Sequence, residues 1–232
     1  MLINTCILIF SRKPEEEAIH KHFSSTIANS SALHKYLYTK TLKAAAGTGL
    51  PVLTTSCIPP QGITFAQKLT HAISHTFSLG YSNVIVLGSD VPHISTHIIN
   101  QSVAQLHNGS SMVLGRNQRG GVYLLAIAKE AFCASTFVTL GWQTNQLYNH
   151  LKAYAQQHKP TTLAVQLQDV NNQHDLKYLY NSYSTALRLQ HILTQFFKPQ
   201  NIYFTICNYS KVANTYWLTY VLRGPPQVAI LA

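Results

Sequence analysis

The stretch that decides the fold is NVIVLGSDVP, residues 83–92. After Asn83, its first half is an uninterrupted apolar run, which is typical of a parallel strand buried on both faces of a sheet. Gly88 then permits a close approach of the backbone, and Pro92 cannot extend the hydrogen-bond ladder of a strand. The stretch therefore predicts a central parallel strand over residues 83–87, with Asp90 just beyond its C-terminal end, partly exposed in a pocket.

Segments on both sides of this stretch alternate between strand-like and helix-like apolar spacing. We expect further strands over residues 5–10, 51–54, 111–114, 121–128 and 162–166. We expect helices over residues 33–46, 63–79, 143–157 and 172–197, and one that ends at His107 after a cap at Ser95 or Thr96. This alternation predicts an α/β protein, a three-layer sandwich with a mostly parallel central sheet. Ligands bind such sheets beyond the C-terminal ends of the strands.

Composition narrows the classes of function. The chain has 232 residues, 17 Lys and Arg against 7 Asp and Glu, and a formal net charge of +10. Its low charge density argues against disorder, and no apolar run reaches the length of about 18 residues that a membrane span needs. The N-terminal stretch lacks the basic start and cleavage site of a signal peptide, so we expect a cytoplasmic protein. Because the basic residues form no dense block, we expect no nucleic-acid partner, whereas phosphorylated small molecules fit the charge.

The chain divides by amino-acid composition into two parts. We expect residues 1–197 to form one domain and residues 198–232 to form a C-terminal extension with two uncharged, aromatic-rich stretches. These stretches can pair as a hairpin that packs on the domain or on a second subunit, as in a homo-oligomer. The four cysteines are scattered without a CxxC pair, so reduced core thiols are expected rather than a disulfide framework.

Several residues near the expected strand ends could carry chemistry. An acid just past a central parallel strand, as Asp90 is, is well placed to hold a divalent metal that neutralises a nucleotide pyrophosphate, although it can equally cap its own loop. Gly120 and Gly121 permit a tight reversal and leave room for a ligand, but a plain hairpin needs the same residues. Arg12 and Lys13 can either meet phosphate at the ligand edge or remain solvated surface charges.

Two other patterns have simple structural explanations. Glu17 and Lys21 are four residues apart and can form an ion pair on a helix. Two histidine pairs have the same spacing but no Glu between their members, so the zinc-protease pattern is absent. The sequence also lacks the G-x-S-x-G motif of serine hydrolases.

Six short motifs follow one another in a specific order. They are FSR, QG, GSDVP, a hairpin with GGVYL, WQT and DVNNQHDL, at residues 10–12, 61–62, 88–92, 115–124, 142–144 and 169–176. Together they resemble the nucleotide-diphospho-sugar transferase-like proteins grouped with the arsenosugar-biosynthesis-type glycosyltransferases, over residues 5–180. The resemblance implies a glycosyltransferase A type of fold and a nucleotide-sugar site at the ligand edge of the sheet.

The resemblance also assigns roles to individual positions. It places Mg²⁺ or Mn²⁺ on Asp90, Gln61 near the nucleotide, and Trp142 by the acceptor pocket, although core packing would explain this tryptophan as well. The resemblance and the residues near the expected strand ends together predict the contacts to nucleotide and substrate. These contacts are Arg12, Lys21, Gln61, Gly88, Arg119, Gly120, Gly121 and Trp142.

The chain departs from the family pattern at charged positions. After the first strand the family has a glycine and a K-T-R-L run, whereas this chain has PEEEAIHKHF, which leaves Lys21 as the comparable cation. In GRNQRGG, Arg119 stands at the family's acid and Arg116 at its proline, and Asn171 replaces a second acid after Asp169. Since an arginine can neither ligate a metal nor act as a base, these changes weaken the case for catalysis and leave the fold intact.

Three functions follow from these residues. The first is a glycosyltransferase with a nucleotide-sugar donor and an unspecified acceptor. The second is a nucleotidyltransferase, and the third is a catalytically impaired protein that binds a nucleotide or another anion through Arg116 and Arg119. Because the two glycines fix the hairpin, we expect Arg119 to point into the site, where it can pair with Asp90 or bind phosphate directly. That pairing would lower the affinity of Asp90 for Mg²⁺ or Mn²⁺, so anions would bind with little dependence on metal.

Overall fold

A six-stranded sheet forms the centre of the protein. The computed structural model describes residues 4–21, 23, 26–55, 57–58, 61–182 and 187–197. The strand order is β2-β1-β3-β5-β4-β6. The strands are β1 (Thr5–Ile9), β2 (Val52–Thr54), β3 (Asn83–Leu87), β4 (Met112–Arg116), β5 (Val122–Ala128) and β6 (Pro160–Thr162). β5 runs antiparallel to both of its neighbours and the other pairs are parallel, which confirms the predicted α/β class with a mostly parallel sheet.

The stretch NVIVL forms β3, and every one of its residues is buried. β3 pairs in parallel with β1 and antiparallel with β5, so its central position is confirmed and it is parallel on one side. The chain leaves β1 toward β2 on one side and leaves β3 toward β4 on the other. The C-terminal ends of β1 and β3 therefore form a topological switch point, the place where open α/β sheets bind ligands.

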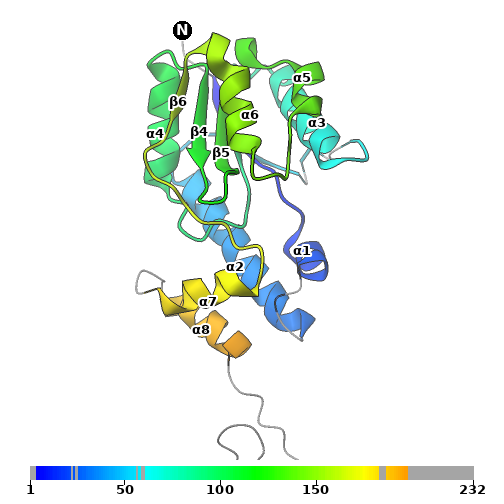
Figure 1. Cartoon of the computed structure of the whole chain (residues 1–232), viewed down its shortest axis with the longest axis vertical. Helices are drawn as coiled ribbons and strands as arrows, with labels where there is room; N and C mark the ends of the chain where they lie inside the picture. Colours follow the sequence, from blue (N-terminus) through cyan, green and yellow to red (C-terminus); the bar gives the residue numbers. More distant parts are fainter. Residues whose placement is uncertain are drawn as a thin grey trace, which may run out of the picture. The chain divides into compact units, whose positions relative to one another are not determined.

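Helices cover both faces of the sheet. The helices are α1 (Pro14–His20), α2 (Ile27–Ala46), α3 (Phe65–Ser78), α4 (Thr96–His107), α5 (Ala134–Thr139), α6 (Leu147–Tyr154), α7 (Gln173–Asn181) and α8 (Leu187–Phe197). Figure 1 shows α4 on one side of the strands and α3 and α5 on the other. Successive β1 residues alternate between the two cores, since Leu8 packs with α3, α5 and α6 and Ile7 packs with α2 and α4. The three-layer arrangement follows from this alternation.

A third apolar cluster lies away from the sheet. Leu33 and Leu37 of α2 pack against Leu176 of α7 and Leu189 of α8. Figure 1 shows α7 and α8 beside α2. This packing fixes the loop that leads into α7, which carries part of the candidate site.

Local capping chemistry sets two helix starts. The Thr64 side chain accepts the Gln67 N–H, and the Gln67 side chain accepts the Thr64 N–H, so α3 begins at Phe65 rather than at residue 63. Ser95 rather than Thr96 caps α4, because its hydroxyl accepts the Ile98 N–H.

The structure corrects several predicted boundaries. β6 covers Pro160–Thr162 rather than residues 162–166, and α6 begins at Leu147, after Gln143 adopts a positive φ of 62°. The long helix predicted over residues 172–197 is two helices, and the short helix α1 was not predicted. Cys6 is buried, but Cys57 and Cys133 are exposed, so the expectation of core thiols is wrong for these two.

Two further expectations concern the C-terminal extension and membrane-spanning helices. The predicted extension over residues 198–232 lies outside the described residues. Among the described residues, none of the helices combines the length and apolarity needed to cross a membrane.

Candidate functional site

Lys21 stands at the centre of a polar cluster beyond the C-terminal ends of β1 and β3. Its ammonium lies 3.0 Å from an Asp90 carboxylate oxygen and 3.4 Å from a Glu17 carboxylate oxygen, and donates a 2.9 Å hydrogen bond to the amide oxygen of Asn171. These partners come from α1, the loop after β3 and the loop before α7. Loops far apart in sequence therefore meet on one cation at the switch point.

The local backbone explains how Lys21 and Asp90 meet. The helix α1 has Pro14 in its first turn and ends where the Lys21 N–H donates to the Glu17 carbonyl, which leaves the Lys21 side chain at the sheet edge. A Cβ on Gly88 would lie 3.0 Å from an Asp90 oxygen, so glycine there gives the carboxylate its room. The Val170 N–H donates a 2.9 Å bond to the Asp90 carbonyl and ties the loop after β3 to the loop before α7.

The opposite charges in this cluster stabilise each other's charged forms. Burial alone would lower the pKa of Lys21, but the attraction of Asp90 and Glu17 outweighs it and raises that pKa. Burial alone would raise the pKa of Glu17, but Lys21 and Arg12 outweigh it and lower that pKa. Arg12 donates to Glu17 at 3.0 Å while 53% of its side chain stays exposed. The predicted helical pair of Glu17 and Lys21 is confirmed, and both of its groups are charged near neutral pH.

Arg119 pairs with a different carboxylate from the one predicted. Its guanidinium donates to Asp175 of α7, and the expected pair with Asp90 is wrong because Lys21 occupies that carboxylate. Asp175 is 2% exposed and also accepts the N–H groups of Asn171 and Asn172, at 2.8 and 3.1 Å. Burial alone would raise the pKa of Asp175, but the bonds from Arg119 and these N–H groups outweigh it and lower that pKa.

The hairpin that carries Arg119 has the predicted glycine turn. Gly120 has a φ of 83°, and a Cβ there would overlap the carbonyl oxygen of Asn145. The Asn117 side-chain oxygen accepts the N–H groups of Arg119 and Gly121, at 3.0 and 2.7 Å. β4 is antiparallel to β5, which is itself antiparallel to β3, so this turn lies at the same sheet edge as Asp90.

Asn171 connects the Lys21–Asp90 ion pair with the Arg119–Asp175 ion pair, and it was not predicted from the sequence as a contact. Its side-chain oxygen accepts from Lys21, its side-chain nitrogen donates to Asp169 at 2.6 Å, and its N–H donates to Asp175. The sequence could have predicted the start of α7, since Asn172 and Asp175 have the spacing of the capping box that they form there. Nothing in that spacing shows that the loop reaches Lys21.

The structure brings Arg12, Lys21, Gly88 and Asp90 to one edge, and the hairpin of Arg119, Gly120 and Gly121 joins them through Asp175 and Asn171. The contacts of the two remaining predicted residues lie elsewhere. Gln61 is exposed, and its N–H donates to a His71 ring nitrogen at 3.4 Å. The indole of Trp142 donates to the Phe137 carbonyl at 2.6 Å and packs on Phe65 and Phe137, as a core residue does.

The donor set does not fit a resident divalent metal as it stands. Among the described residues, no three His, Cys, Asp or Glu side chains gather as metal ligands. Asp90 is the carboxylate that would hold the ion, and the Lys21 ammonium lies 3.0 Å from its oxygen. A second cation there would meet like-charge repulsion, so Lys21 is itself the counter-charge of Asp90.

The fold and the position of this cluster define an α/β protein with the nucleotide-diphospho-sugar transferase fold. A solved protein of this fold from Desulfovibrio desulfuricans G20, provisionally assigned as a nucleotide-diphospho-sugar transferase, aligns with a TM-score of 0.64 and 17% identity over 84% of this chain and 99% of its own. A cytidylyltransferase from Leptospira borgpetersenii aligns with a TM-score of 0.42 and 14% identity, over 83% and 94% of the two chains. A search of curated proteins gave no match.

Family membership comes from the sequence. Residues 25–144 match the family DUF2064, described as an uncharacterized protein conserved in bacteria. The chain belongs to this family. The matched segment holds Asp90 and the glycine hairpin, whereas Lys21 and Asn171 lie outside it.

Proposed function

We propose that the chain is a nucleotide-sugar-dependent glycosyltransferase that binds the donor diphosphate through Lys21 without a metal ion. The observation that carries the proposal is the position of the Lys21 ammonium, at the switch point between β1 and β3. Its side chain is 24% exposed, so it is accessible to a ligand while being held by three partners. An ammonium is a strong partner for phosphate oxygens, and a nucleotide-sugar presents two phosphates.

The charges of the site suit the transfer step. The acceptor oxygen bonds to the anomeric carbon of the sugar, and the bond from that carbon to the diphosphate oxygen breaks. Negative charge then grows on the leaving diphosphate, where Lys21 and the half-exposed Arg12 can offset it, as Lys and Arg clamps do in phosphoryl chemistry. As Lys21 turns to the diphosphate, Asp90 is released and can accept the proton of the acceptor hydroxyl.

A second candidate is a protein that binds the nucleotide but transfers nothing. The carboxylates Glu17 and Asp175 are both held in ion pairs, and an amide stands at Asn171 where the family resemblance expects an acid. Both features remove bases from the site while leaving its cations. This candidate differs from the first in turnover and not in binding.

Calorimetric titration tests the proposal. UDP-, dTDP-, GDP- and CDP-sugars are titrated into the full chain in EDTA and in Mn²⁺, and donor hydrolysis is followed in parallel. We expect one donor class to bind with affinities that agree within about threefold between the two conditions, or about 0.7 kcal/mol. Donor turnover supports the transferase, and its absence with binding intact supports the second candidate. Absence of binding by every donor, or strict dependence on Mn²⁺, would overturn the proposal.

A further inference from the structure

A cavity of about 170 Å³ adjoins the Lys21 cluster, and the contacts described so far leave it without a role. Its walls come from the loop after β3, the tip of the β4–β5 hairpin, the loop before α7, and α7 itself. Pro92 lines it two residues after Asp90, and Val170 lines it one residue before Asn171. The cavity and the cation site therefore share two loops, and a ligand in one lies next to a ligand in the other.

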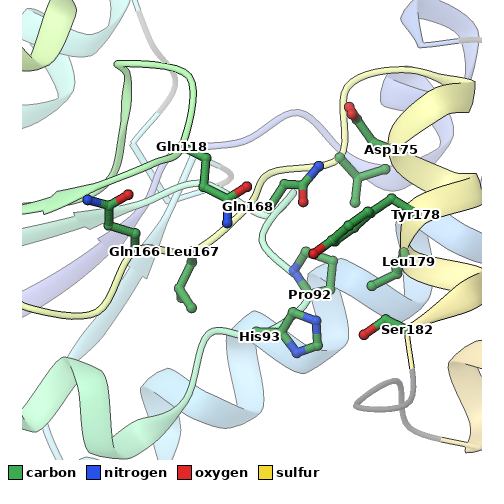
Figure 2. A pocket seen from close by; sticks show the side chains of 11 residues that line it. Pro92, His93, Gln118, Gln166, Leu167, Gln168, Asp175, Tyr178, Leu179 and Ser182 are labelled. Carbon is green, nitrogen blue, oxygen red and sulfur yellow. The ribbon is translucent and has the colours of Figure 1, made fainter.

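Unused hydrogen-bonding groups line this cavity. Gln118, Gln166 and Gln168 each contribute a primary amide, and Tyr178 contributes a phenol. None of these side chains makes a hydrogen bond within the part of the chain that the structure describes. Figure 2 shows the amide of Gln118 directed toward Gln168, whose own amide points toward Asp175 and Tyr178. The amides of Gln118 and Gln168 and the phenol of Tyr178 thus supply donors and acceptors around one space.

The lining carries no available charge. Asp175 is the lining acid, and both of its oxygens are engaged, by Arg119 and by two backbone N–H groups. Burial, and then the charge of Lys40, lower the pKa of His93, so its imidazole is neutral at pH 7. An ionic ligand would find no counter-charge on these walls, whereas a neutral ligand rich in hydroxyl groups would find a partner for each.

We propose that this cavity binds the acceptor, an uncharged molecule with several hydroxyl groups, such as a single sugar ring or a short polyol. A hydroxyl both donates and accepts, as a glutamine amide does, and one face of a sugar ring can pack on the Tyr178 ring. The volume is below the range of about 300–1,000 Å³ that holds drug-sized ligands, which favours one ring over an oligosaccharide. The role of acceptor rests on the proposed function, but the binding of such a molecule does not.

The assay is ligand-observed NMR on the full chain. The probes are methyl glucoside, methyl galactoside, methyl mannoside, glycerol and myo-inositol, with the four common ribonucleosides as a separate arm. We expect at least one sugar or polyol to bind and no nucleoside to displace it. In Gln168→Leu that binding weakens about tenfold, the effect of losing one or two neutral hydrogen bonds. Gln118→Leu replaces an exposed side chain at the hairpin tip and gives a second test that does not depend on the fold of the α7 loop.

Two control variants separate this inference from the proposed function. Lys21→Met is expected to lose nucleotide-sugar binding in calorimetry while it keeps the sugar or polyol signal. Lys152→Met, at an exposed position of α6, is expected to keep both. Failure of every nucleotide-sugar with sugar binding intact would overturn the proposed function alone. Three results would overturn the assignment of this cavity. They are failure of every sugar and polyol to bind, binding that neither glutamine variant weakens, and displacement of the bound sugar or polyol by a nucleoside.

Discussion

Replacing Lys21 by methionine tests the central electrostatic claim. Methionine keeps the length and apolar stem of the side chain but removes the ammonium that contacts Asp90, Asn171 and Glu17. Two changes follow. The donor diphosphate loses its main counter-charge, and the Asp90 and Glu17 carboxylates are left without the cation that separated them. The variant should therefore bind nucleotide-sugars weakly without metal and regain affinity when Mn²⁺ is added.

The contacts set the size of these effects. One charge-assisted hydrogen bond contributes about 1.5–3 kcal/mol, which corresponds to about a 10- to 150-fold loss of affinity in EDTA. The cost to folding is smaller because 31% of the Asp90 side chain is exposed and water can replace the lost bond. An ion pair in such a position contributes about 1 kcal/mol or less to the free energy of unfolding.

The measurement is calorimetric titration of the bound donor into wild type, Lys21→Met and the matched control Lys152→Met, each in EDTA and in Mn²⁺. Urea unfolding of the same samples reports stability. The expected pattern is a large loss in EDTA, partial recovery in Mn²⁺ for Lys21→Met alone, and nearly unchanged unfolding midpoints. If Lys21→Met binds the donor in EDTA as the wild type does, Lys21 does not hold the diphosphate and the reasoning fails.

Three further outcomes are expected. Gly120→Ala should destabilise the fold by about 1–3 kcal/mol in urea unfolding, since the new methyl group meets the Asn145 carbonyl and φ is 83°. Arg119→Met should lower the free energy of unfolding by about 2 kcal/mol, because buried Asp175 loses the hydrogen bond and the charge that Arg119 provides. The folded pKa of that acid lies below its unfolded value, so the wild type's advantage should be full above about pH 5 and shrink as pH falls below about 4. Hydrogen bonds from the neighbouring serine and threonine hydroxyls lower the pKa of the exposed Cys133 thiol to about 7, so its alkylation rate should rise with a midpoint near that pH, as mass spectrometry can follow.

The sequence predicted the parts of the fold that depend on local pattern. The run VIVL, residues 84–87, has no polar position, which is typical of a strand covered on both faces, and β3 is such a strand. Gly120 is required by its own φ and by the backbone opposite it, so the turn is readable from residues 117–121. The start of α3 could have been placed to the residue from Thr64 and Gln67, because a capping box is also local.

The partners within the site could not be predicted in the same way. Lys21 reaches across 69 positions to Asp90, and Arg119 reaches across 56 positions to Asp175. Which cation meets which acid depends on where α1 ends and on how α7 packs against α2, and neither is encoded in the motifs themselves. Arg119 was expected beside Asp90 because the two glycines fix its hairpin, but the side-chain cation beside Asp90 is Lys21.

The departures from the family pattern are consistent with one another. An aspartate at position 171 would surround Lys21 with three carboxylates, and the excess negative charge would favour a divalent metal and oppose a diphosphate. Asn171 instead offers Lys21 a neutral oxygen, and Arg119 neutralises the nearby buried Asp175. Asn171 and Arg119 thus move the site in one direction, away from holding a metal and toward holding an anion with side-chain cations such as Lys21. Changes that merely followed the loss of a function would have no reason to compensate one another, so this agreement supports the proposal that the site binds an anion.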